Sequence, residues 1–420
     1  MTARTLLAKG SLARAAGLVA PAMAAANVLQ YVLQLAASHA LSPDDFGAFG
    51  SLLALGVVGA VPMLALQTVV ASRVAHTADD VDAQDAEVGL LLASALRIAV
   101  VVTLVALLVA PVVSLFLRVP LLAAVWLALS FGPLAIAGTA QGVLQGRERF
   151  AALAGLFLGV SGLRVAGGIL ALVARPNVTS AMAGTALGAL LAGILGLVAM
   201  RHRVRGPAAP TPTRVLTELR HAASGVLALL ILGGADLLLA RHLLSGSESG
   251  RYAAASLVAR GCFWAPQFVA VLVLPHLASG RTAMARHATA FVCVLGVLEV
   301  LAGLLVPRSV IGLVLGPAYT SLAHVLALFA ATGAALAVLQ LMLYAGIARG
   351  GSVVGQVVWA AIAVEVGVVL TFGPALVGLV SIALACTALA ALVSALLIFQ
   401  QDAAPGGTDV TSLPLPSSVS

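Results

Sequence analysis

The sequence predicts an all-α polytopic membrane protein with about twelve transmembrane helices, arranged as two parallel six-helix lobes around a central cavity. Hydrophobic residues make up 61% of the 420 residues and charged residues only 9%, with a mean hydropathy of +1.13. A soluble domain carries about 25% charged residues. Apolar runs long enough to span a bilayer, about 20 residues, recur along the chain. In addition, one short stretch between two apolar runs occurs twice.

The two copies of this stretch are residues 38–49 (SHALSPDDFGAF) and 241–252 (RHLLSGSESGRY). At a constant offset of 203 residues, the identical pairs are His39/His242, Leu41/Leu244, Ser42/Ser245 and Gly47/Gly250. Asp45 is replaced by Glu248, and Phe49 by Tyr252. Such an offset indicates an internal duplication, a common plan of membrane transporters. We expect the two copies to form matching turns that set how the first two spans of each half pair.

Twelve apolar runs follow in order. They cover residues 12–37, 48–72, 89–116, 121–144, 151–174, 181–200, 222–243, 251–278, 288–306, 322–348, 352–372 and 375–399. Because six is even, both halves enter the membrane in the same sense, which makes the repeat parallel. We expect six-helix lobes at 1–200 and 222–399. A proline-containing cytoplasmic linker at 201–221 would join them, and a disordered cytoplasmic tail would occupy 400–420.

The distribution of basic residues predicts the orientation, because cytoplasmic loops are enriched in lysine and arginine. One side receives Arg4, Lys9, Arg14, Arg73, Arg147, Arg149, Arg201, Arg203, Arg205, Arg214, Arg220, Arg281, Arg286 and Arg349. The other side receives Arg118, Arg175, Arg251 and Arg308. Both termini are therefore expected in the cytoplasm, in a multi-pass protein of the plasma or inner membrane. We interpret the net charge of +7 as a consequence of this orientation, and we expect no nucleic-acid partner.

Several charged residues fall inside predicted spans, where each costs about 2.5 kcal/mol or more at the bilayer centre. The basic ones are Arg97, Arg164 and Arg260, and the acidic ones are Asp236, Glu299 and Glu365. One interpretation is internal ion pairs between helices, or snorkelling near helix ends. The other is a water-filled cavity that receives an anion, since the arginine fork binds phosphate through two hydrogen bonds.

The first span carries a polar stripe. Asn27, Gln30, Tyr31 and Gln34 recur at i, i+3, i+4 and i+7, which places them on one helical face. Such a stripe packs against other helices or lines a polar cavity, and we favour the cavity.

The sequence lacks the motifs that ATP hydrolysis or metal binding would require. Lys9 is the only lysine, so a Gly-x-x-x-x-Gly-Lys-Ser/Thr phosphate loop is excluded. No cluster of His, Cys and carboxylates has metal-ligand spacing, and no loop could hold a soluble catalytic domain. We expect neither an enzyme nor a protein with a metal or cofactor.

Three passages resemble the polysaccharide biosynthesis (Wzx-type) oligosaccharide flippases, of the multidrug/oligosaccharidyl-lipid/polysaccharide exporter superfamily. Residues 41–49 (LSPDDFGAF) are similar to the family's Leu-Gly/Ser-Pro-x-x-Phe/Tyr-Gly-x-Phe/Tyr signature. Residues 142–150 (GVLQGRERF), followed by Arg164, are similar to its Gly-x-x-Gln-Gly-x-x-Arg-Phe pattern. Residues 234–237 (GADL) with 250–252 (GRY) are similar to its aspartate-bearing seventh span and the loop after it.

The resemblance implies two lobes that rock between inward-open and outward-open states. It implies transport of a polyprenyl-pyrophosphate-linked oligosaccharide to the outer leaflet, within the lipid membrane, with a glycan polymerase or glycosyltransferase complex as a partner. By position, Arg164 and Arg260 would face the pyrophosphate or acidic sugars, and Asp236 would couple transport to a cation. Arg97 and the stripe from Asn27 to Gln34 complete the expected cavity residues.

Three alternatives stay open. A drug exporter of the same superfamily would favour acidic and aromatic cavity residues, whereas arginine is at least as frequent as acid inside these spans and aromatics are only 5%. A non-transporting scaffold of a glycan-assembly complex would not depend on its intramembrane charges. A major-facilitator transporter also has twelve spans, but residues 73–87 lack its Gly-x-x-x-Asp-Arg-x-Gly-Arg-Arg-like loop.

Overall fold

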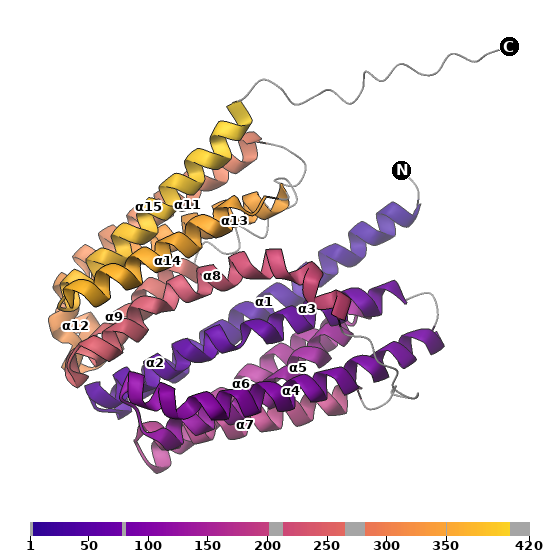
Figure 1. The fold of residues 1–420 in the computed structure, drawn as a ribbon, viewed down its shortest axis with the longest axis horizontal. Helices are drawn as coiled ribbons and strands as arrows, with labels where there is room; N and C mark the ends of the chain where they lie inside the picture. The colour runs from indigo at the N-terminus through magenta and orange to yellow at the C-terminus, as the bar shows by residue number, and fades with distance from the viewer. Residues whose placement is uncertain (1–2, 78–80, 201–212, 265–281, 350, 404–420) are drawn as a thin grey trace.

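The computed structural model is all-helical over the residues that it describes, 3–77, 81–200, 213–264, 282–349 and 351–403 (Figure 1). The first seven helices are α1 (Ala3–Ala40), α2 (Pro43–Gly59), α3 (Val61–His76), α4 (Val81–Leu117), α5 (Leu121–Gly146), α6 (Phe150–Ala174) and α7 (Val178–Met200). The others are α8 (Thr213–Leu243), α9 (Gly246–Trp264), α11 (Thr282–Leu305), α12 (Arg308–Val314), η2 (Pro317–His324), α13 (Leu326–Ala348), α14 (Val353–Phe372) and α15 (Leu376–Ala403).

Eleven helical segments in these ranges are long and apolar enough to cross a membrane. The predicted eighth span, 251–278, begins within α9, and its remainder from residue 265 lies outside the described residues. The predicted second span, 48–72, is interrupted at Ala60, between α2 and α3. Pro62 lies in the first turn of α3, where its missing N–H does no harm; inside a continuous helix it would remove a hydrogen bond and clash with the preceding turn.

The helices form two lobes, which confirms the predicted fold class (Figure 1). In the first lobe α5 packs against α3, α4 and α7, and α6 packs against α1 and α7. In the second, α13 packs against α9, α11 and α15, and α14 packs against α8 and α15. The expected linker falls partly at 201–212, outside the described residues, and its remainder is the start of α8. Of the expected tail, residues 404–420 also lie outside the described residues.

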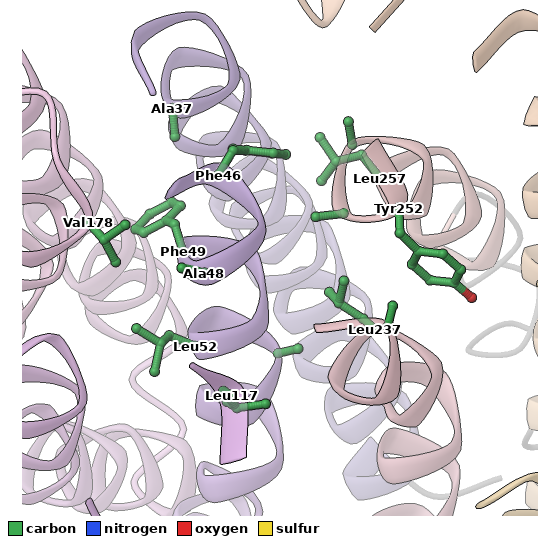
Figure 2. Packing of buried hydrophobic residues seen from close by; sticks show 14 of the residues in the cluster. Ala37, Phe46, Ala48, Phe49, Leu52, Leu117, Val178, Leu237, Tyr252 and Leu257 are labelled. Carbon is green, nitrogen blue, oxygen red and sulfur yellow. The ribbon is translucent and has the colours of Figure 1, made fainter. Parts of the chain in front are cut away.

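The lobes meet at one end and diverge towards the other (Figure 1). We call the meeting end the closed end; it contains the connections α1–α2, α4–α5 and α8–α9. Here α2 of the first lobe packs mainly against α9 and α8 of the second. Buried residues from both lobes form one hydrophobic cluster; on α2, Phe46 points towards Leu257 and Tyr252 of the second lobe, whereas Phe49 and Leu52 point towards Val178 of the first (Figure 2).

The duplicated stretch starts the second helix of each lobe. The N–H of Asp45 donates to Ser42 Oγ at 3.2 Å, and Ser42 Oγ donates back to Asp45 Oδ2 at 3.2 Å. In the other copy, the N–H of Glu248 donates to Ser245 Oγ at 3.4 Å, and Ser245 Oγ donates to Glu248 Oε2 at 3.2 Å. Both pairs satisfy backbone donors that a helix start leaves free. The sequence repeat is therefore also a repeat of capping geometry.

The two copies pack directly on each other. A Cβ on Gly250 would lie 1.7 Å from the carbonyl oxygen of Pro43, and a Cβ on Gly47 would lie 2.7 Å from Ser249 Oγ. Only glycine at these positions lets the backbones of α2 and α9 approach so closely, the usual device of helix contacts in membranes. The closed end is thus sealed by backbone contact as well as by the hydrophobic cluster.

Candidate functional site

The polar stripe of α1 faces a cavity between the lobes. The cavity has a volume of about 430 Å³ and is lined by residues of α1, α2, α3, α5, α6 and α7 from the first lobe and of α8, α9, α13 and α15 from the second. All four stripe residues line it: Asn27, Gln30, Tyr31 and Gln34. Helical periodicity placed them on one face, and the packing of the two lobes turns that face inward.

Two arginines enter this cavity from opposite lobes, Arg164 from α6 and Arg260 from α9. Arg260 Nη1 donates a hydrogen bond to Gln34 Oε1 at 3.1 Å, which links α9 to α1. The Nε of Arg164 is buried and has no hydrogen-bond partner among the described residues. Neither arginine forms an ion pair with a carboxylate in the part of the chain that the structure describes.

Asp236 also lines the cavity, from α8. It is 8% exposed, and its carboxylate accepts two hydrogen bonds of 2.8 Å, from Tyr252 Oη to Oδ2 and from the N–H of Leu237 to Oδ1. Tyr252 replaces the phenylalanine of the first repeat copy, Phe49. The second lobe therefore gains one hydroxyl at this position and uses it to hold the cavity aspartate.

Glu365 on α14 is completely buried, and its charge interacts with that of Asp236. Neither of its carboxylate oxygens has a hydrogen-bond partner among the described residues. The residues lining the cavity do not include it. The sequence marked Glu365 as an acid within a span and Tyr252 as part of the 250–252 passage, but it did not predict that Tyr252 would hold Asp236; the one local signal for that role was its difference from Phe49 within an otherwise similar repeat.

Arg97 does not belong to this site. It is exposed on α4 and is absent from the cavity lining. Val100, Val101 and Leu104 lie at i+3, i+4 and i+7 from it and are 57% to 60% exposed, so Arg97 lies on the outward face of its helix. The sequence could place an arginine within the third span, but the rotation of that helix turns it away from the cavity.

Comparison with solved structures places this geometry in a known architecture. The structure is similar to an inward-facing multidrug resistance MATE family transporter of the MOP superfamily, with a TM-score of 0.71 and 12% identity over 89% of this chain and 94% of that one. This chain has the MATE fold. An outward-facing MATE family transporter of the MOP superfamily gives a TM-score of 0.64 with 14% identity, covering 93% of this chain and 95% of that one.

The MATE transporter VcmN of Vibrio cholerae, in a mutant form, gives a TM-score of 0.64 with 16% identity, covering 94% of this chain and 97% of that one. At these identities the likeness shows the fold alone. This fold is compatible with the superfamily named by the sequence resemblance. The likeness does not identify the flippase family within that superfamily. No protein-family model and no curated protein matches the chain.

Proposed function

We propose that this protein is an alternating-access transporter that flips a polyprenyl-pyrophosphate-linked oligosaccharide, or a related glycolipid, from the cytoplasmic to the outer leaflet. The observation that carries the proposal is Arg164, a cavity arginine whose buried Nε has no partner among the described residues. An unpartnered buried donor costs about 1–3 kcal/mol, and an oxygen of an anionic ligand would supply the missing acceptor. With Arg260 on the opposite wall, the charged lining residues in the described part of the chain are two arginines and one aspartate.

A pyrophosphate fits this arrangement because the arginine fork makes paired hydrogen bonds to phosphate oxygens. The cavity volume of about 430 Å³ is typical of small-molecule pockets. The pyrophosphate and the adjoining sugar would lie in it, while the rest of the glycan extends towards the divergent end and the polyprenyl chain stays in lipid. The amides of Asn27 and Gln30 would bind sugar hydroxyls.

The proposed direction rests on the charges at the two ends. Arg73, Arg147, Arg149 and Arg349 lie at connections of the divergent end, and by the positive-inside rule they support a cytoplasmic position for that end and for both termini. The cavity would then be loaded from the cytoplasmic leaflet of the cell membrane, with the closed end outside. The higher TM-score with the inward-facing transporter supports this state.

Asp236 is the proposed site of cation coupling. It is the one carboxylate among the described residues that line the cavity, and Tyr252 fixes its orientation. A cation bound there would offset the negative charge of Asp236. It would thereby change the affinity of the cavity for the anionic substrate. A glycan polymerase or glycosyltransferase complex is the proposed partner that receives or supplies the lipid-linked glycan.

A second candidate is export of a small soluble molecule, since a neighbour in fold is a multidrug resistance MATE family transporter and the cavity is of small-molecule size. The two arginines would then select anionic compounds. A deletion strain distinguishes the candidates. We expect lipid-linked glycan to accumulate in the cytoplasmic leaflet and to be restored to the surface by the intact gene. Normal surface glycan in the deletion strain, with increased sensitivity to an anionic compound, contradicts the flippase proposal and supports the second candidate.

A further inference from the structure

The closed end carries a cluster of contacts between the lobes that the proposed function does not use. Arg118 follows the last residue of α4 in the first lobe, and Arg241 lies in the last turn of α8 in the second. Both side chains cross to the other lobe.

Arg118 Nη2 donates to three carbonyl oxygens at the end of α8, those of Arg241 at 2.9 Å, Leu244 at 2.8 Å, and His242. The backbone of Arg118 has φ +49°, the left-handed conformation that glycine usually supplies after a helix. With the backbone in this conformation, the side chain of Arg118 reaches the end of α8 in the other lobe. Its cation lies where the dipole of α8 is negative.

Arg241 makes the reciprocal contacts. Its Nε donates to the carbonyl oxygen of Leu117 at 2.8 Å, and its Nη2 donates to that of Arg118 at 2.8 Å, so it binds the end of α4. Its Nη1 donates to Asp44 Oδ1 at 2.5 Å and to Ser249 Oγ at 3.0 Å. Arg241 is 6% exposed, so its guanidinium lies largely away from water, whereas the side chain of Asp44 is 61% exposed.

His242 adds a further contact between the same two helix ends. Its ring stacks on Phe116 with centroids 4.2 Å apart, and its Nδ1 lies 2.8 Å from the Phe116 carbonyl oxygen. Nearby, Tyr319 packs edge-on against Phe46; burial raises the pKa of Tyr319 to about 12, so that ring stays neutral. The position of Arg241 in the first repeat copy is Ser38, so the clasp is an addition to the duplicated plan.

We propose that Arg118 and Arg241 form a crossed clasp that holds the closed end shut, each arginine binding the carbonyl-terminated helix end of the opposite lobe. Opening this end would break all the bonds from the two arginines to carbonyls of the opposite lobe at once, because both helix ends separate together. The clasp therefore sets the balance between the state seen here and a state open at this end. The carbonyls carry the clasp rather than Asp44, whose side chain is 61% exposed and whose ion pair with Arg241 is weakened by water.

The test measures the separation of the lobes at the closed end and needs no substrate. Spin labels are placed at Leu121 and Leu313, exposed residues of α5 and α12, after the native cysteines are replaced. Double electron–electron resonance is recorded on the full chain in lipid nanodiscs. We expect one short distance in the parent protein. In the Arg118→Ala, Arg241→Ala variant we expect a second, longer distance that takes at least half of the population.

Matched variants make the outcome specific. Arg175→Ala and Arg251→Ala remove exposed arginines of the same end and should leave the distribution unchanged. Asp44→Asn should change it little. Arg118→Lys with Arg241→Lys keeps both charges but loses the forked donors, and should open the end as the alanine variant does. An unchanged distribution in the lysine or the alanine double variant overturns the proposal, as does an Asp44→Asn variant that opens as fully as the loss of both arginines.

Discussion

Arg260 on α9 donates a hydrogen bond from Nη1 to Oε1 of Gln34 on α1, at 3.1 Å, and so joins the two lobes across the cavity. Gln34 is 8% exposed, so its amide is held in place by the surrounding helices. The amide orients the guanidinium without cancelling its charge. A carboxylate at the same position would also orient the guanidinium, but it would cancel the charge.

This contrast gives the first prediction. Gln34→Glu should lower the affinity for a pyrophosphate-bearing lipid by about a hundredfold, because an ion pair with Arg260 competes with the ligand. Gln34→Ala should cost about tenfold, the loss of one hydrogen bond to a charged group. Ligand-dependent thermal shift of the purified protein measures both. The control is Gln67→Glu, since Gln67 bonds Gln145 outside the cavity. Equal affinity in the Glu and Ala variants contradicts the role of Arg260 as an anion site.

Arg164→Ala should abolish transport and leave a folded, inserted protein, because its Nε has no protein partner to lose among the described residues. Surface glycan in a complemented deletion strain measures transport, and size-exclusion chromatography checks folding. Arg175→Ala, at the exposed end of the same helix, is the matched control. If the Arg164→Ala strain makes normal surface glycan, Arg164 has no part in the mechanism.

Asp236→Asn should reduce transport more than Glu365→Gln does. Asp236 lines the cavity, whereas Glu365 is completely buried and does not line it. Tyr252→Phe should give an intermediate loss, because it removes the bond that orients the carboxylate. Uptake into vesicles with an imposed ion gradient compares the three variants. Equal losses for Asp236→Asn and Glu365→Gln, or no loss for either, count against Asp236 as the coupling residue.

Arg97→Gln should leave transport within about twofold of the parent value, because Arg97 lies on the outward face of α4 and does not line the cavity. The same surface-glycan assay applies, with Arg164→Ala as the positive control. A loss comparable with that of Arg164→Ala would bring Arg97 back into the substrate path.

Gly250→Ala should destabilise the protein by about 2 kcal/mol, the cost of overpacking a filled site. Its Cβ would lie 1.7 Å from the carbonyl oxygen of Pro43, so α2 and α9 must move apart. Thermal unfolding in detergent should show a lower midpoint. Gly155→Ala is the control, since nothing lies within 4 Å of its Cβ and alanine favours a helix. A Gly250→Ala variant as stable as the control is inconsistent with backbone contact at the closed end.

The sequence by itself determined the properties that depend on residues close together along the chain. Membrane insertion follows from runs of apolar residues, because every span must be apolar over about 20 residues whatever its neighbours are. The polar stripe of α1 follows from helical periodicity, since Asn27 to Gln34 share one face of a single helix. The duplication follows from residue identities at a fixed offset, and the structure adds that its two copies cap and contact matching helices.

Tertiary structure alone decided which groups meet across the lobes. Gln34 and Arg260 are 226 residues apart, and only the packing of α1 against the second lobe brings them within hydrogen-bond distance. Arg97 and Arg164 are alike in sequence, both arginines within apolar runs, and the rotation of α4 and α6 separates them. The crossed contacts of Arg118 and Arg241 likewise need two helix ends from different lobes. Local periodicity fixes which residues share a helix face, whereas the direction of that face depends on packing against distant segments.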